Sequence, residues 1–178
     1  MNSSVSKDLR NLQIKIMGSA THKGFEVWFY PEYNGVKGFL GIQDIILLGL
    51  NPSSGTFPSQ KDKKLYALLK EKRLENIHIT DFIKVRAKNT QVSDLLRNTT
   101  LISEQVAFLK KEIAIIKPKI IILLGMRCEQ LLKEYIPGVT CKVVRIKHYG
   151  YRYQPQEEVF KEISESLDKI IEIYRTME

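Results

Sequence analysis

The sequence predicts an α/β fold, a three-layer αβα sandwich around a central, mainly parallel sheet of four strands. Two observations carry this prediction. Short apolar runs recur along the chain, and each is followed by a segment with the spacing of an amphipathic helix. Runs that are apolar throughout are typical of strands buried on both faces, and strands that alternate with helices form parallel sheets covered on both sides.

Four apolar runs are expected to form the strands. They are residues 44–50 (DIILLGL), 76–83 (NIHITDFI), 119–124 (KIIILL) and 141–146 (CKVVRI). In such sheets the ligand binds outside the carboxyl ends of the strands. The loops at those ends are residues 49–55, 81–88, 125–127 and 147–152. We therefore expect the functional site to be built from these loops.

Five segments have the apolar spacing of helices. They are residues 6–17, 62–73, 100–117, 126–134 and 155–176. Pro118 is expected to end the third helix, and Pro155 suits the start of the fifth. Residues 1–43 are expected to hold the first helix and then a lead-in segment, residues 25–41 (FEVWFYPEYNGVKGFLG). With no repeat or linker, residues 1–178 are expected to form one domain.

The composition narrows the classes of partner. The chain has 28 Lys and Arg against 20 Asp and Glu, a net charge of +8, which favours nucleic acid or an anionic membrane surface but also suits plain solubility. No apolar run approaches the ~20 residues of a membrane span, and the polar N-terminus does not resemble a signal peptide. Two cysteines and three histidines without metal-ligand spacing predict no metal and a cytoplasmic, reducing setting.

The loop at residues 49–55 (GLNPSSG) follows a strand and precedes a helix. It lacks the Gly-Lys-Ser/Thr ending of a P-loop and the glycine spacing of a dinucleotide site. Taken alone, it is compatible with an ordinary turn rich in Gly, Asn, Pro and Ser. Its neighbours along the chain give it a more specific interpretation.

Four segments in order resemble the uracil-DNA glycosylase superfamily, over about residues 42–175. They are ILLGLNPSSG, ITDFIK, KPKIIILLGMRCEQLL and the His148-Tyr149-Gly150 tripeptide. The Gly-x-Asn-Pro loop is most similar to the mismatch-specific and single-strand-selective branches. The resemblance implies a monofunctional DNA glycosylase that flips a deaminated or damaged base, uracil or a related one, and hydrolyses its N-glycosidic bond in base excision repair. It implies no cofactor, DNA (double- or single-stranded) as the partner, and a monomer.

The resemblance also implies roles for individual residues. Asn51 would orient the attacking water, and His148 would hydrogen-bond the carbonyl oxygen of the departing base. The residues implied to bind the base are Gly49, Leu50, Pro52, Ser53, Phe57 and Asp81. Those implied to bind DNA are Lys84, Arg86, Lys88, Lys147, Tyr151 and Arg152. Phe57 could equally be a core aromatic that packs the loop, and the basic residues could equally form a solvated face.

Three departures from the family pattern stand out. Ser53 replaces a glycine, Tyr149-Gly150 replaces Pro-Ser after the histidine, and Asp81 stands where many members have a base-reading asparagine. A carboxylate accepts hydrogen bonds but donates none unless it is protonated, so Asp81 suits a base edge rich in N–H groups and opposes the O4 carbonyl of uracil. Asp81 could instead pair with Lys84 or Arg86 without reading the base.

Two other functions remain open from the sequence. One is a nucleic-acid-binding module of the same fold with weak or no catalysis, which the departures at Asp81 and Tyr149 favour. The other is a hydrolase of free nucleosides or nucleotides, which would use the same edge of the sheet. The absence of lysine from residues 49–55 argues against Schiff-base lyase chemistry.

Overall fold

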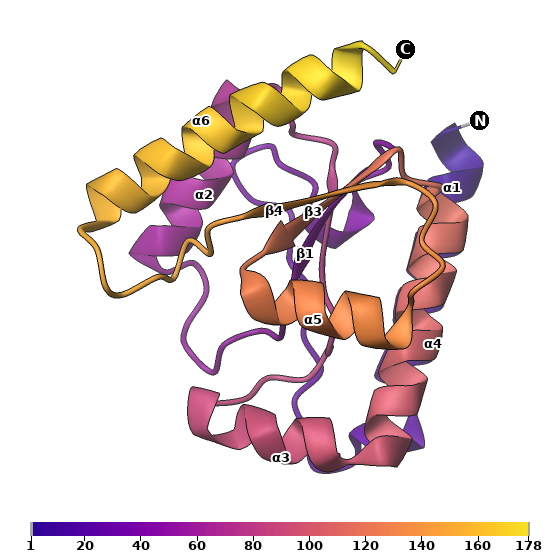
Figure 1. The fold of residues 1–178 in the computed structure, drawn as a ribbon. Helices are drawn as coiled ribbons and strands as arrows, with labels where there is room; N and C mark the ends of the chain where they lie inside the picture. The colour runs from indigo at the N-terminus through magenta and orange to yellow at the C-terminus, as the bar shows by residue number, and fades with distance from the viewer. Residues whose placement is uncertain (1, 178) are drawn as a thin grey trace.

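A four-stranded parallel sheet lies at the centre of the computed structural model, which describes residues 2–177 (Figure 1). The strands are β1 (Ile45–Gly49), β2 (His78–Asp81), β3 (Ile120–Leu124) and β4 (Lys142–Ile146). Their order across the sheet is β2-β1-β3-β4, and every neighbouring pair is parallel. The predicted fold class is therefore confirmed.

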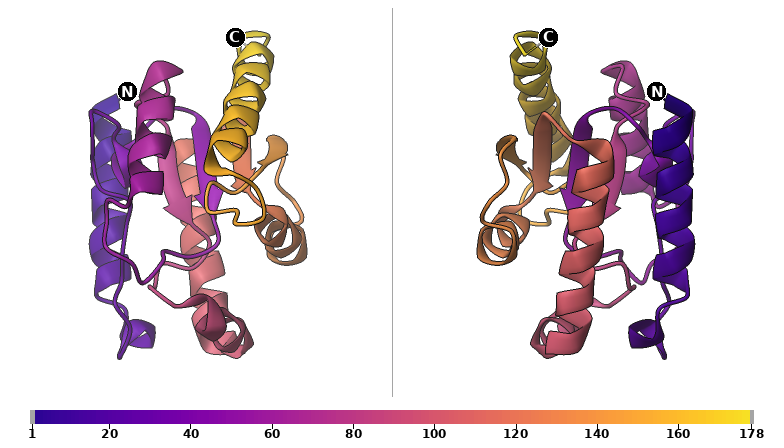
Figure 2. Two further views of the ribbon diagram at one scale, coloured as in Figure 1. Left: turned by 90° about the vertical axis from the view of Figure 1, so that its left-hand side faces the viewer. Right: turned by 90° about the vertical axis from the view of Figure 1, so that its right-hand side faces the viewer.

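Helices cover both faces of the sheet. They are α1 (Asn2–Met17), α2 (Gln60–Glu71), α3 (Val92–Arg97), α4 (Thr99–Ile116), α5 (Met126–Tyr135) and α6 (Gln156–Arg175). Side chains alternate along a strand, so Ile46 and Leu48 pack towards the layer of α1, α4 and α5, whereas Ile45 and Leu47 pack towards α2 and α6. Figure 1 shows the sheet between these two layers, and Figure 2 shows each layer from outside.

The predicted elements all form, with bounds that differ by a few residues at most helix and strand ends. Helix α2 begins two residues before the predicted residue 62, because Ser59 and Asp62 form a capping box at its first turn. Helix α3 was not predicted from the apolar spacing. It has six residues, which is too short for a repeating apolar spacing to stand out in the sequence. Three short 3-10 helices also form: η1 (Ala20–His22), η2 (Gly38–Leu40) and η3 (Asn89–Gln91).

The lead-in segment runs beside the chain that follows β2. Val27 and Val85 form an antiparallel bridge, the Trp28 backbone N–H donates to the Lys84 carbonyl at 2.9 Å, and the Arg86 N–H donates to the Glu26 carbonyl at 2.8 Å. These bonds join the lead-in segment to the chain after β2 by its backbone. They also bring Trp28 and Tyr30 to the carboxyl end of the strands.

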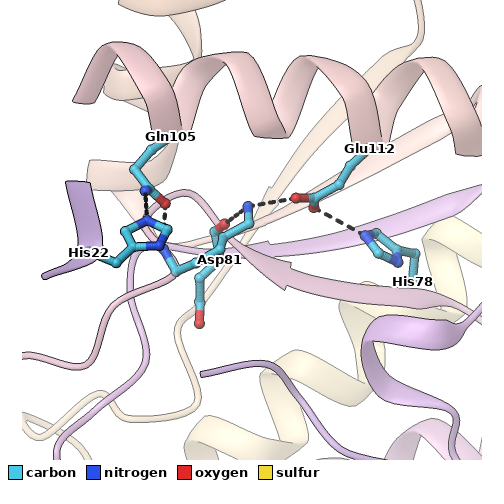
Figure 3. Close-up of polar contacts among 6 residues, drawn as sticks. His22, His78, Asp81, Gln105 and Glu112 are labelled. Atoms are coloured by element: carbon cyan, nitrogen blue, oxygen red, sulfur yellow. Dashed lines mark hydrogen bonds and ion pairs between the residues drawn. The ribbon is translucent and has the colours of Figure 1, made fainter. Parts of the chain in front are cut away.

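A buried polar network fixes the end of β2 against the helices (Figure 3). It comprises His22, His78, Lys84, Gln105 and Glu112, all buried. The Lys84 ammonium lies 2.9 Å from Glu112 Oε1 and also donates to the Asp81 backbone carbonyl, while His78 Nε2 lies 3.2 Å from Glu112 Oε2. Burial alone would raise the pKa of Glu112, but its contacts with Lys84 and His78 outweigh burial and lower it.

The hydrogen bonds that run from Lys84 through Gln105 and His22 each join one donor to one acceptor. Gln105 Oε1 accepts the Lys84 backbone N–H at 2.8 Å, so the Gln105 amide donates to His22 Nε2 at 2.6 Å. His22 Nδ1–H then donates to the Ile16 carbonyl at 2.8 Å. The network thus ties α1, α4 and the segment after β2 together without leaving these atoms unpaired.

Glu112→Gln is expected to lower the free energy of unfolding by about 3–5 kcal/mol, because it leaves the buried Lys84 ammonium without a counter-charge. Denaturant unfolding at pH 7 measures this, with the exposed Glu165→Gln as a control expected to change little. The double variant Lys84→Met/Glu112→Gln removes the stranded charge and is expected to recover part of the loss. A single variant as stable as the control would contradict the importance of the ion pair.

Candidate active site

A cavity of about 510 Å³ opens at the carboxyl end of the sheet. The loops after β1, β3 and β4, the start of α2 and the lead-in segment form its wall. From the predicted Gly-x-Asn-Pro loop, the residues that line it are Leu50, Asn51, Pro52 and Ser53. Five further predicted residues also line it: Phe57, Arg86, His148, Tyr151 and Arg152. The structure thus gathers most of the predicted site residues around one space.

Asn51 is held by its amide nitrogen. Its Nδ2 donates to the Pro52 carbonyl at 3.0 Å and to the Ala87 carbonyl at 3.5 Å. The loop itself is tied to the chain after β2, because the Ile83 N–H donates to the Leu50 carbonyl at 2.9 Å. Since Nδ2 is occupied, the Oδ1 atom of Asn51 is the one available to accept a hydrogen bond from water.

His148 is held as a neutral imidazole. Its Nδ1 accepts the Gly150 backbone N–H at 2.8 Å, which places the ring proton on Nε2. Burial, with a smaller contribution from the Lys61 charge, lowers the pKa of His148 to about 4. The ring also stacks on Tyr149, with centroids 4.9 Å apart. His148 therefore offers a single N–H donor, Nε2, at neutral pH.

Gly150 allows this arrangement because of its size. A Cβ atom at position 150 would lie 2.9 Å from His148 Nδ1 and 3.0 Å from Cε1, closer than side chains tolerate. The Tyr149-Gly150 departure from the family pattern thus has a local role: the tyrosine ring packs on the imidazole, and the glycine lets the backbone N–H reach it.

Asp81 lies behind the wall of the cavity. It is 4% exposed and does not line the cavity, and neither does Gly49, which is buried beside it. A Cβ atom at position 49 would lie 2.2 Å from Asp81 Oδ1, so only glycine leaves room for this carboxyl group. Burial raises the pKa of Asp81 to about 7, although the charge of Lys84 opposes the rise.

Phe57 is both a cavity residue and part of an aromatic cluster. Its ring centroid lies 5.5 Å from Trp28, 5.8 Å from Tyr33 and 5.6 Å from Tyr66. Phe57 was predicted either to contact the base or to pack the loop as a core aromatic, and it both lines the cavity and packs against other rings. The cluster holds the ring in place, and the ring forms part of the cavity wall.

The predicted basic residues divide into three groups. Arg86 and Arg152 line the cavity; Arg86 is largely buried, and its Nη1 donates to the Gly55 carbonyl at 2.9 Å. Lys88 is exposed outside the cavity, and Lys147 also lies outside it, paired with Glu162 and Gln154. The prediction that Lys84 binds DNA is wrong, because Lys84 is buried in its ion pair with Glu112.

Tyr151 lies at the mouth of the cavity and is 40% exposed. The Lys147 ammonium lies 5.2 Å from the centroid of its ring, and Tyr153 packs edge-on at 5.6 Å. Tyr153 is 89% exposed. The loop after β4 therefore presents two adjacent aromatic rings to solvent.

Sequence reasoning missed three cavity residues, Trp28, Tyr30 and Lys61. Met126, Arg127 and Tyr149 also line the cavity; they lie in loops expected to build the site, but no role was predicted for them. Trp28 and Tyr30 come from the lead-in segment, where no strand or helix pattern indicated their position; the density of aromatic residues was the available signal.

Metal-ligand clusters and membrane-spanning helices were sought among residues 2–177. No cluster of three or more His, Cys, Asp or Glu side chains is placed to hold a metal ion. No helix in this part of the chain has the length and apolar character needed to cross a membrane.

The parallel α/β sandwich carries a cavity at its carboxyl edge, lined by an amide and a neutral imidazole from separate loops. The family model of the uracil DNA glycosylase superfamily matches residues 43–174, and the chain belongs to this superfamily. No sequence among curated proteins matches the chain. The matched region includes every predicted site residue but excludes Trp28 and Tyr30.

Asp81→Asn is expected to change how stability depends on pH. The Asp81 carboxyl group is protonated up to about pH 7 in the folded chain but has an ordinary pKa of 3.8, so between these values the folded state binds the extra proton. The free energy of unfolding of the wild type should therefore fall, relative to Asp81→Asn, by about 1.4 kcal/mol per pH unit as pH rises through this window. Denaturant unfolding at pH 5, 6, 7 and 8 measures the difference, and a constant difference would contradict a raised pKa.

Proposed function

We propose that the protein is a monofunctional DNA glycosylase, which flips a deaminated or damaged base into the cavity and hydrolyses its N-glycosidic bond, as in base excision repair. One observation carries the proposal: Asn51 and His148 line the same cavity, and hydrogen bonds to the backbone give each side chain a single role. The cavity volume of about 510 Å³ falls in the range of small-molecule sites.

In the proposed mechanism, Asn51 Oδ1 accepts a hydrogen bond from the attacking water and orients it towards the sugar carbon. An amide has no proton-accepting state near neutral pH, so Asn51 acts by positioning and not as a base. The bond from water oxygen to the sugar carbon forms as the N-glycosidic bond breaks. The electron pair of that bond leaves with the base.

His148 stabilises the departing base. Negative charge collects on a carbonyl oxygen of the base as the bond breaks, and the Nε2–H of His148 donates a hydrogen bond to it, a contribution of about 3 kcal/mol. Because the pKa of His148 is lowered to about 4, the imidazole stays neutral above about pH 5. After its oxygen bonds to the sugar carbon, the attacking water loses a proton to solvent, and the departing base anion takes up a proton from solvent.

The surroundings of the cavity support DNA as the partner. Lys61, Arg127 and Arg152 line it in addition to Arg86, and the chain carries a net charge of +8. Tyr151, at the mouth, is placed to fill the space that a flipped nucleotide leaves in the stack. Lys147 contacts the Tyr151 ring, and because its charge is paired with Glu162 we do not expect it to hold a phosphate.

An abasic-site cleavage assay tests the activity. Oligonucleotides carry uracil, hypoxanthine, xanthine or thymine opposite each normal base, and in single strands. Asn51→Ala and His148→Ala are each expected to lower the excision rate by about 100-fold or more, because each removes a group that acts at the breaking bond. Asn11→Ala, at an exposed position of α1, is the matched control.

If the wild type releases none of these bases but still binds DNA, the glycosylase proposal fails, and a binding module of the same fold explains the protein better. If it instead cleaves free nucleosides and does not bind oligonucleotides, the nucleoside hydrolase is the better explanation.

DNA binding should depend on the cavity cations individually. Lys61→Gln, Arg127→Gln and Arg152→Gln are each expected to weaken binding and to lower the slope of log affinity against log salt by about 1, because each removes one phosphate contact. Fluorescence anisotropy over a salt series measures this. Two control variants should change the slope little: Lys147→Gln, because the Lys147 charge is already paired with Glu162, and Lys63→Gln at an exposed position of α2. Equal effects of all five variants would contradict binding of DNA across the mouth of the cavity.

A further inference from the structure

Arg86 lies in the wall of the cavity with its guanidinium group in contact with other parts of the chain. The side chain is 15% exposed, and its Cζ atom lies over the Trp28 ring, 5.1 Å from the centroid. Nη1 donates to the Gly55 carbonyl at 2.9 Å, and Nε lies 3.4 Å from Glu26 Oε1. The guanidinium group is therefore held by three contacts within the protein.

The contact with Gly55 reaches the exposed part of the loop that carries Asn51. Backbone hydrogen bonds from the chain after β2 reach this loop at carbonyls up to that of Pro52. Gly55 lies three residues further on, within the exposed residues 53–56. The Arg86 side chain thus extends the attachment of the loop from Pro52 to Gly55.

Trp28 is fixed on the stretch of backbone that lies beside Arg86. The Trp28 N–H donates to the Lys84 carbonyl at 2.9 Å, and the Arg86 N–H donates to the Glu26 carbonyl at 2.8 Å. The indole also packs edge-on against Tyr30, with centroids 4.9 Å apart. A planar guanidinium group stacks favourably on an aromatic face, so the indole limits the conformations of the arginine side chain.

We infer that Arg86 is a positioning residue for Asn51, and that Trp28 holds Arg86 in the conformation that lets it bond the loop. This role rests on the proposed glycosylase function and differs from the DNA contact that the family resemblance implies for Arg86. Trp28 precedes residues 43–174, so half of the device lies outside the region that the family model matches.

The placement of the Asn51 amide has to be accurate, because this residue acts only by orienting water. A displacement of about 1 Å can cost about 100-fold in rate. Without Arg86 the exposed part of the loop is less restrained, and bound substrate should react more slowly. Loss of a phosphate-binding arginine has a different effect: it weakens DNA binding and lowers the salt slope by about 1.

Single-turnover excision and DNA binding over a salt series, measured on the same variants, separate these two roles. Arg86→Met is expected to lower the single-turnover rate at saturating enzyme by about 10- to 100-fold and to leave the salt slope unchanged. Arg86→Lys keeps the charge but not the planar group, and it is expected to lower the rate by about tenfold. Arg97→Met makes the same change at an exposed position of α3 and should alter neither quantity.

A double-mutant cycle tests the part played by Trp28. Trp28→Leu is expected to slow excision by about tenfold, and the Trp28→Leu/Arg86→Met variant should be no slower than Arg86→Met alone, because the two side chains act as one unit. Phe25→Leu, which changes an exposed aromatic residue of the same segment, is the matched control. Additive effects of the two changes would overturn the role of Trp28.

Backbone ¹⁵N relaxation tests the attachment of the loop without catalysis. The order parameters of residues 53–57 should be near the rigid value of about 0.85 in the wild type and in Arg97→Met, and should fall towards about 0.6 in Arg86→Met. Unchanged order parameters, or a lower salt slope with an unchanged rate, would overturn the role of Arg86.

Arg86→Lys keeps the role of Arg86 testable if Arg86→Met does not fold. The outcome is separate from that of the excision assay. If the wild type releases no base, the glycosylase proposal fails, and the order parameters still decide whether Arg86 holds the loop. Excision that is independent of Arg86 refutes only its positioning role.

Discussion

The buried ion pair between Lys84 and Glu112 is the contact on which the rest of the site depends. Lys84 joins α4 to the chain after β2 and holds the Asp81 carbonyl at the strand end. Its own backbone carbonyl accepts the N–H of Trp28, so the lead-in segment is built on the same residue. The neighbouring Ile83 N–H in turn holds the loop that carries Asn51. The Lys84 side chain and the backbone of residues 83 and 84 thus contact three segments around the cavity.

Desolvation sets the chemistry of the polar groups at this edge of the sheet. Burial lowers the pKa of His148 and raises that of Asp81, so both groups favour their neutral forms. A neutral imidazole can donate from Nε2 only, and a neutral carboxyl group can donate where a carboxylate cannot. Of the two, only His148 lines the cavity, where its Nε2–H can meet the carbonyl oxygens of the proposed substrates.

The departures from the family pattern are explained by their neighbours. Gly150 brings a backbone N–H onto His148, and Tyr149 stacks on the imidazole while its hydroxyl reaches Asp62. Asp81 fits beside Gly49 because no Cβ atom intervenes. Tyr30 then stands between Asp81 and the cavity, and it comes from outside the region that the family model matches. A base-reading asparagine and a Pro-Ser turn are replaced here by a set of residues that contact one another.

The sequence by itself determined the parallel sandwich, the order of its elements and the edge at which the cavity forms, because buried strands and amphipathic helices leave local patterns in composition and spacing. Through its resemblance to the family, the sequence also pointed to Asn51 and His148, whose loops follow strand ends. Only the tertiary structure decided that Lys84 is buried, that Lys147 is paired with Glu162, and that Tyr30 lines the cavity in front of Asp81. Burial and pairing are set by contacts between residues far apart in the chain, such as Lys84 with Glu112, and no local pattern encodes them.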